Sequence, residues 1–119
     1  MKPPPGITVR NGVVLRMLRS LYGLKQAARD WNKLCKASLV KWGFIQSLAD
    51  PCLFINDKKK INLLVYVDDI FVATREKTTV QWFAKKLSSR FNTKSLGEIS
   101  KVLGTRITRD RQNRTLYLD

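Results

Sequence analysis

The sequence has no histidine, only two cysteines and only four prolines among its 119 residues. Without histidine, the chain cannot carry a Ser-His-Asp or Cys-His nucleophile system, a paired-histidine zinc helix or a Cys/His zinc finger. The two cysteines, Cys35 and Cys52, form no C-x-x-C pair. This spacing argues against a disulfide framework or a metal knuckle and favours a reducing compartment.

Long hydrophobic runs are also missing. The longest apolar run, residues 63–73, contains two aspartates, and three prolines interrupt the first ten residues. A signal peptide or a membrane span would need an unbroken apolar segment. We therefore expect an intracellular protein, cytoplasmic or nuclear, that is neither secreted nor membrane-bound.

Acidic residues are scarce. The chain has 23 Lys and Arg against 9 Asp and Glu, which gives a formal charge of +14. Residues 1–50 and residues 51–119 each carry about half of this excess, so it is not confined to a tail. A basic bias of this size suits a polyanion such as nucleic acid, because each neutralised phosphate releases counterions. The alternative is a well-solvated surface with no such partner.

The length and an apolar fraction of 44% suit one small folded domain over residues 1–119. Its first ten residues, which contain Pro3, Pro4 and Pro5, predict an extended lead-in. Asn11-Gly12 predicts a turn, and residues 13–18 predict a short strand.

Two helices are predicted. Apolar residues at three- and four-residue spacing indicate an amphipathic helix over residues 24–42 with a basic outer face, and Gly43 suits a left-handed cap at its end. Thr78 with Gln81 resembles a capping box that opens a second helix. Its predicted apolar stripe consists of Val80, Phe83, Ala84, Leu87 and Phe91.

The remaining apolar runs predict strands over residues 52–55, 61–67, 70–74, 102–108 and 115–118. The second and third of these are separated only by Asp68-Asp69, which predicts a hairpin with a two-residue loop. The predicted order is β-α-β-β-β-α-β-β. This order favours an α+β fold in which helices cover one face of a mainly antiparallel sheet.

The adjacent carboxylates of Asp68 and Asp69 are the clearest candidate site. At a separation of about 4 Å they would repel by about 1 kcal/mol in water and about 4 kcal/mol near a protein surface. A hard divalent cation, Mg²⁺ or Mn²⁺, would offset this repulsion, since Mg²⁺ favours one or two carboxylates plus substrate phosphates. The alternative is a solvated turn, because Asp is a favoured turn residue.

Several motifs occur in one order along the chain: SLYGLKQAARDW (20–31), DPCLFI (50–55), YVDD (66–69), LGE (96–98) and VLG (102–104). This series resembles the reverse transcriptases of copia-type LTR retrotransposons. The resemblance implies a polymerase-palm-like antiparallel sheet with two helices packed on one face. It also implies an RNA-directed DNA polymerase that uses an RNA or DNA template, a DNA primer and deoxynucleoside triphosphates, with Mg²⁺ or Mn²⁺ as cofactor.

The resemblance also implies roles for single residues. Asp68 and Asp69 would be the catalytic, metal-binding carboxylates, with Asp68 the stronger ligand because successive strand side chains point to opposite faces. The nucleotide and template pocket would comprise Tyr66, Gly23, Lys25, Gln26 and Arg29. Val102, Leu103 and Gly104 would form the primer grip.

Four of these residues also have a plain structural explanation. Gly23 suits a turn ahead of a helix, and Tyr66 suits a strand aromatic that packs on its sheet. Lys25 and Arg29 suit a solvated helix face.

Two departures bear on activity. The family takes a third metal-binding carboxylate from a strand before the proline-rich segment, and no Asp or Glu precedes Asp30 here. Val102 also stands where an aromatic residue is common. We therefore expect a palm-region fragment, once part of a polyprotein, with little or no polymerase activity of its own. The alternatives are a non-catalytic basic nucleic-acid-binding module and a product with no stable fold.

Overall fold

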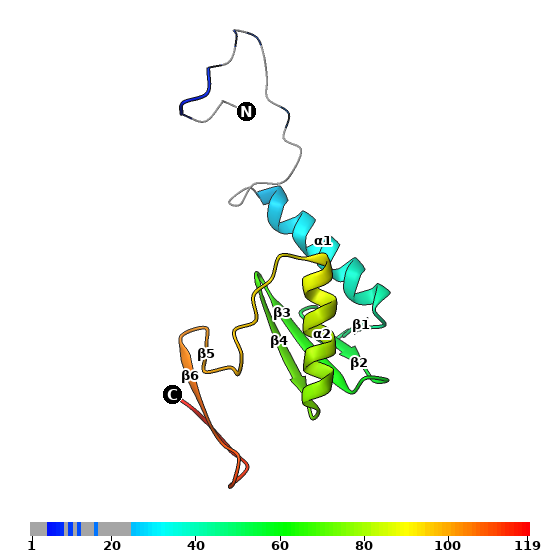
Figure 1. Cartoon of the computed structure of the whole chain (residues 1–119), viewed down its shortest axis with the longest axis vertical. Coiled ribbons are helices and arrows are strands. Elements are labelled where there is room, and N and C mark those ends of the chain that lie inside the picture. The colour runs from blue at the N-terminus through cyan, green and yellow to red at the C-terminus, as the bar shows by residue number, and fades with distance from the viewer. Residues whose placement is uncertain (1–4, 9, 11, 13–15, 17–24) are drawn as a thin grey trace. The chain divides into compact units, whose positions relative to one another are not determined.

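The computed structural model describes residues 5–8, 10, 12, 16 and 25–119. The chain divides into two units, residues 1–43 and residues 44–119, which are described in turn (Figure 1). The predicted strand over residues 13–18 lies outside the described residues except for residue 16, which is in no strand. In the predicted lead-in, Pro5 and Gly6 form a turn, and the described residues after them have no regular structure.

The first unit contains helix α1 (Lys25–Lys41). Its bounds and its left-handed end at Gly43, where φ is 86°, confirm the predicted helix and cap. One face of the helix is buried at Cys35, Ser38 and Leu39, whereas Arg29, Lys33, Lys36 and Lys41 are exposed. Burial raises the pKa of the Cys35 thiol above its ordinary value, which favours the protonated thiol over the thiolate.

The second unit is built on a four-stranded antiparallel sheet with the order β1-β2-β3-β4. Its strands are β1 (Ile45–Gln46), β2 (Leu53–Asn56), β3 (Ile61–Tyr66) and β4 (Asp69–Thr74). The predicted strands are confirmed to within a residue or two, and the two-residue strand β1 was not predicted. Burial alternates strictly along β3, where Ile61, Leu63 and Val65 are buried. The sheet therefore has one covered and one open face.

Helix α2 (Lys77–Arg90) lies along the covered face of this sheet (Figure 1). Phe83 is 1% exposed, and its ring meets Phe44 edge to face with the ring centroids 5.8 Å apart. The capping-box prediction is wrong, because the N-cap is Glu76, which makes no side-chain capping bond, and Thr78 lies inside the first turn. The stripe prediction is correct for Phe83 but wrong for Val80, which is 40% exposed.

A second antiparallel sheet lies near the C-terminus of the chain. It consists of β5 (Lys101–Val102), β6 (Thr105–Asp110) and β7 (Thr115–Leu118). The predicted single strand over residues 102–108 is wrong, because a turn at Leu103-Gly104 divides it into β5 and β6. Gly104 has a φ of 88°, and this left-handed conformation interrupts the extended run.

The described residues thus form two helices and two antiparallel sheets, which confirms the α+β class. Among these residues, neither helix is long and apolar enough to cross a bilayer.

Candidate functional site

The acidic pair lies where β3 turns into β4. The strand register pairs Tyr66 with Asp69 and Val65 with Ile70, so Val67 and Asp68 form the two-residue connection. The prediction that Asp68 and Asp69 form the loop is therefore wrong by one position, since Asp69 begins β4. This register keeps Val65 and Ile70 on the covered face. A one-residue slip would turn every side chain of β4 to the other face.

Val67 holds an unusual backbone conformation at this turn, with a φ of 51°. A β-branched residue in the left-handed region is a steric outlier that costs about 1–2 kcal/mol. Packing does not explain the valine, because it is 66% exposed. The strain persists because the paired strands on both sides fix the path of the chain, and such strain is concentrated at functional sites.

Tyr66 and Asp69 lie on the open face of the sheet. They are directly paired across the hairpin, and Tyr66 alternates with the buried residues of β3. The Tyr66 side chain is 44% exposed and does not join the core. The strand-alternation reason for ranking Asp68 above Asp69 does not apply, because Asp68 lies in the turn and not in a strand.

The two carboxylates are both exposed at the tip of the hairpin. Among the described residues, no group of three or more His, Cys, Asp or Glu side chains could hold a metal ion. A pair of carboxylates nevertheless fits Mg²⁺, which keeps several waters and completes its octahedron with substrate phosphates. The carboxylates of Asp68 and Asp69 therefore suit a Mg²⁺ site whose other ligands are water and substrate phosphates. They do not suit a site closed by protein ligands alone.

The predicted primer-grip residues lie on a second hairpin, between β5 and β6. Val102 pairs with Thr105, and Leu103 and Gly104 form the connection, with φ values of 48° and 88°. Two successive left-handed residues are typical of a tight type I′ hairpin turn. Leu103 is 72% exposed at its tip. The geometry thus presents an apolar side chain to solvent at the tip of a short hairpin.

The remaining predicted pocket residues belong to the first unit. Gly23 lies outside the described residues, and Lys25 is the first residue of α1. Gln26 and Arg29 are exposed on the first turns of α1. The first turn contains no acidic residue, so its positive end is not neutralised from within the helix.

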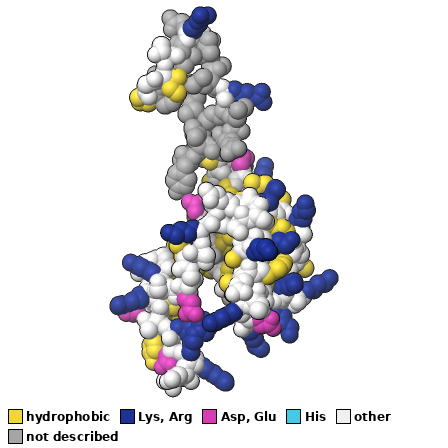
Figure 2. All heavy atoms as spheres, viewed as in Figure 1, with side chains coloured by type: hydrophobic (Ala, Val, Ile, Leu, Met, Phe, Trp, Pro, Cys, Tyr) yellow, Lys and Arg dark blue, Asp and Glu magenta, His cyan; other side chains and the backbone are white. Residues whose placement is uncertain are grey.

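Basic side chains are distributed over the visible surface. Figure 2 shows lysine and arginine side chains at many separate places among the described residues, with fewer acidic side chains between them. This distribution agrees with the even spread of the net charge of +14 along the sequence. A surface of this kind attracts polyanions over a range set by the ionic strength.

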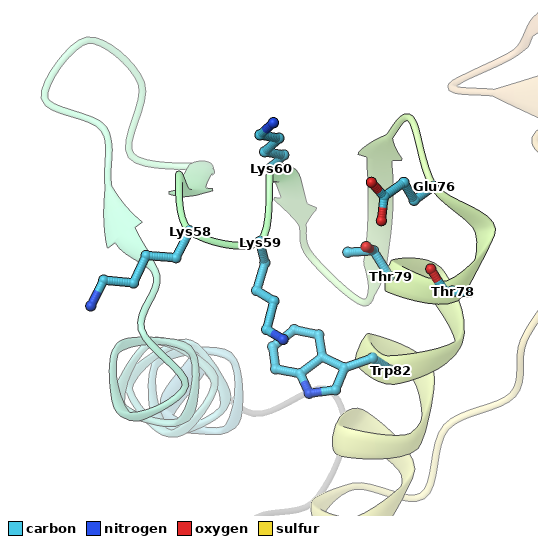
Figure 3. Close-up of a pocket in the computed structure, with 7 residues that line it drawn as sticks. All are labelled: Lys58, Lys59, Lys60, Glu76, Thr78, Thr79 and Trp82. Atoms are coloured by element: carbon cyan, nitrogen blue, oxygen red, sulfur yellow. The ribbon is translucent and has the colours of Figure 1, made fainter.

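One feature of the second unit was missed by the sequence analysis. An open pocket lies between the β2–β3 loop and the first turns of α2 (Figure 3). We call it the lysine–tryptophan pocket, and its lining residues are Lys58, Lys59, Lys60, Glu76, Thr78, Thr79 and Trp82. The three successive lysines were visible in the sequence, but their position beside Trp82 depends on how the sheet and helix pack.

Comparisons with known proteins agree with the resemblance found in the sequence. A family model described as reverse transcriptase (RNA-dependent DNA polymerase) matches residues 1–119. The chain is 32% identical, over 99% of its length, to the Retrovirus-related Pol polyprotein from transposon TNT 1-94 of Nicotiana tabacum. It is 35% identical, over 87% of its length, to the corresponding polyprotein from transposon RE1 of Arabidopsis thaliana.

A putative transposon Ty5-1 protein of Saccharomyces cerevisiae is 32% identical over 90% of the chain. The chain spans only 9% of the tobacco polyprotein, 7% of the Arabidopsis polyprotein and 36% of the yeast protein. No solved structure matches the chain.

Proposed function

The chain belongs to the reverse transcriptase (RNA-dependent DNA polymerase) family, in its copia-type retrotransposon branch, and from this premise we propose that it is part of a polymerase palm. In this proposal the β3–β4 hairpin carries the catalytic carboxylates Asp68 and Asp69. Helix α2 would cover one face of the palm sheet, and the template and primer would lie over its open face.

The strained hairpin is the observation that carries the proposal. A buried strand ends at Tyr66, an exposed valine takes a left-handed conformation, and two carboxylates follow without a break. A solvated turn does not need Val67, since Asn or Gly would adopt the same conformation at lower cost. Retained strain beside an acidic pair therefore supports a functional role over a simple bend.

Asp68 and Asp69 would together hold Mg²⁺ or Mn²⁺ at the tip of the hairpin. When bound between carboxylates and phosphates, such an ion neutralises charge on the transferred phosphoryl group. Tyr66 would support the primer end or the incoming nucleotide from the open face of the sheet. Val102, Leu103 and Gly104 would hold the primer strand through the β5–β6 hairpin.

Lys25, Gln26 and Arg29, with Gly23, would contact the template and the nucleotide triphosphate in this proposal. The proposed polymerase would act as part of a longer, intracellular polyprotein, because the chain spans only a small share of the length of its Pol relatives. Positioning and charge neutralisation would supply most of the rate enhancement.

Metal binding can be tested without polymerase activity. In ¹⁵N-labelled protein, substoichiometric Mn²⁺ should broaden the amide signals of residues 66–69 more than those at Leu103 and Gly104. The D68N/D69N variant should lose this broadening. Asp57→Asn is the matched control, because Asp57 is also an exposed turn aspartate of the same sheet. Equal broadening in wild type and D68N/D69N would contradict the proposed site.

We further propose that the isolated 119-residue chain has little or no polymerase activity. The reason is that only two carboxylates lie at the hairpin, and no third metal ligand joins them within the described residues. Primer extension by the purified chain should not exceed background in Mg²⁺ or Mn²⁺. Robust extension that disappears in Asp68→Ala would refute this part of the proposal.

A non-catalytic nucleic-acid-binding module is the second candidate function. The large positive charge and the exposed basic side chains favour it. Duplex binding would then fall steeply with salt but would be the same with Mg²⁺ or EDTA and in D68N/D69N. A Mg²⁺ requirement for binding at fixed ionic strength would instead favour the palm.

A further inference from the structure

We propose that the lysine–tryptophan pocket is a phosphate-binding site, separate from the acidic hairpin and independent of any catalytic role of that hairpin. β3 and β4 separate the two sites. The β2–β3 loop precedes Ile61 at one end of β3, and the acidic hairpin follows Tyr66 at the other end. A six-residue strand spans roughly 17–20 Å, so one phosphate cannot contact both sites.

The loop that carries the lysines is fixed by its own hydrogen bonds. The backbone N–H of Lys59 donates to Oδ1 of the buried Asn56 at 3.1 Å, and the N–H of Lys60 donates to the Asp57 carbonyl at 3.2 Å. Lys60 has a left-handed φ of 50°. Because these bonds hold the loop backbone, the Cα atoms of the three lysines have defined positions, which lowers the entropic cost of ordering the loop on binding.

Lys59 is held further by α2. Its Nζ lies 5.1 Å from the centroid of the Trp82 ring, within the range of a cation–π interaction (Figure 3). This contact places one ammonium group between the loop and the helix. Lys58 and Lys60 point away from Trp82 and from each other in the same view. The three ammonium groups therefore point in different directions. This arrangement suits successive phosphates along a strand more than it suits one small anion.

The helix side of the pocket supplies neutral hydrogen-bonding groups. Thr78 and Thr79 lie in the first turn of α2, which contains no acidic residue. Thr79 is only 8% exposed, and its hydroxyl has no hydrogen-bond partner among the described residues. No fully buried side-chain polar atom of the described residues lacks a partner, so this hydroxyl is still reached by solvent. It lies in the pocket wall, available to an acceptor.

Glu76 opposes anion binding because its carboxylate also lines the pocket. With three lysines and one glutamate, the pocket still has a net charge of about +2. The combination of ammonium groups, a threonine hydroxyl and a helix N-terminus matches the chemistry of a phosphate oxygen. The phosphate could come from a nucleic-acid backbone or from a small compound such as pyrophosphate.

The test measures binding of a fluorescent oligothymidylate to the 119-residue chain by anisotropy at several salt concentrations. The K58A/K59A/K60A variant should bind about a hundredfold more weakly at 0.1 M salt. Its plot of log affinity against log salt should also be shallower by about 2, since each contacted phosphate of a single strand contributes about 0.7. The matched control is K85A/K86A/K94A, which removes the same charge from exposed positions outside the pocket. We expect it to lose about twofold.

Two single variants distinguish a pocket from a general charge effect. Glu76→Gln should tighten binding about threefold, and Thr79→Val, which keeps the side-chain shape, should weaken it about threefold at an unchanged salt slope. Circular dichroism and thermal unfolding confirm that each variant is folded. The proposal fails if the two triple variants lose affinity equally, or if Glu76→Gln has no effect.

Competition identifies the source of the phosphate. Pyrophosphate is added at concentrations where sodium chloride of equal ionic strength does not displace the oligonucleotide. If pyrophosphate displaces the oligonucleotide, the ligand is a compact phosphate compound. If only unlabelled oligonucleotide displaces it, the ligand is the backbone of a nucleic-acid strand. Polyglutamate of matched charge should not compete at the pocket. If polyglutamate displaced the labelled oligonucleotide as effectively as unlabelled oligonucleotide does, the assignment of the pocket to phosphate would be overturned.

Discussion

The two sheets of the second unit are made in different ways. The four-stranded sheet β1–β4 has buried apolar residues on β2 and β3, covered by α2, and these include Phe54 and Leu63. The three-stranded sheet β5–β7 has no buried residue, and Leu116, Tyr117 and Leu118 of β7 are at least half exposed. Hydrophobic burial therefore stabilises the first sheet and contributes little to the second.

Backbone bonds and exposed ion pairs hold the second sheet instead. Arg106 and Asp119 exchange backbone hydrogen bonds, and their side chains pair at 2.7 Å with 71% and 56% of their surfaces exposed. An exposed pair of this kind contributes about 0–1 kcal/mol and is screened by salt. We infer that the acidic hairpin has a rigid base, whereas the β5–β6 hairpin can open without unfolding the rest of the unit.

The largest expected effect comes from a change in the buried sheet. Leu63 is fully buried, so Leu63→Ala should lower the free energy of unfolding by about 2–5 kcal/mol through lost burial and the cavity left behind. Leu118→Ala is the control, because Leu118 is 64% exposed and should cost less than about 0.5 kcal/mol. Chemical denaturation monitored by circular dichroism measures both. If the two variants lost similar amounts of unfolding free energy, the two sheets would share one core.

A smaller effect is expected from relief of strain at the hairpin tips. Val67→Asn should raise the free energy of unfolding by about 1 kcal/mol, because Asn adopts the left-handed region more readily than Val. Leu103→Asn makes the same kind of change at a φ of 48°. It should not alter global unfolding, since the β5–β6 hairpin lies outside the buried sheet. A destabilised Val67→Asn variant would show that the left-handed valine is not strained.

Local pattern explains which parts of this fold could be predicted. The helix at residues 24–42, its glycine cap and the β3–β4 pair were predicted because each depends on periodicity or on one residue with a special conformation. The hairpin loop was misplaced by one residue because register depends on which face packs against α2. The break at Leu103-Gly104 was missed because the apolar run continues through it.

The candidate site, too, could be predicted where it depends on local sequence and not where it depends on packing. Motif resemblance singled out Asp68, Asp69 and residues 102–104 as candidates, since each group is contiguous in the sequence. It could not reveal that Val67 is strained, because that is a property of the folded backbone. The lysine–tryptophan pocket was missed because it joins Lys59 and Trp82, which are 23 positions apart in the sequence. Only the packing of the loop beside α2 brings them together.

The smallest expected effect is a pH dependence confined to the exposed sheet. At the β6–β7 turn, hydrogen bonds donated by the backbone and side chain of Asn113, and then by the Gln112 N–H, lower the pKa of Asp110 below its ordinary value. Folding therefore favours the ionised carboxylate. The stabilisation is present above the unfolded pKa and is lost as the pH falls through the lower, folded pKa.

Acid titration followed by NMR checks this expectation. The amide signals of Gln112 and Asn113 should shift with a midpoint below the ordinary Asp pKa of 3.8, and Asp110→Asn should remove the transition. The Leu63 amide, in the buried sheet, should not follow the same titration. If it did, protonation at an exposed turn would be coupled to the core, and the independence of the two sheets would be disproved.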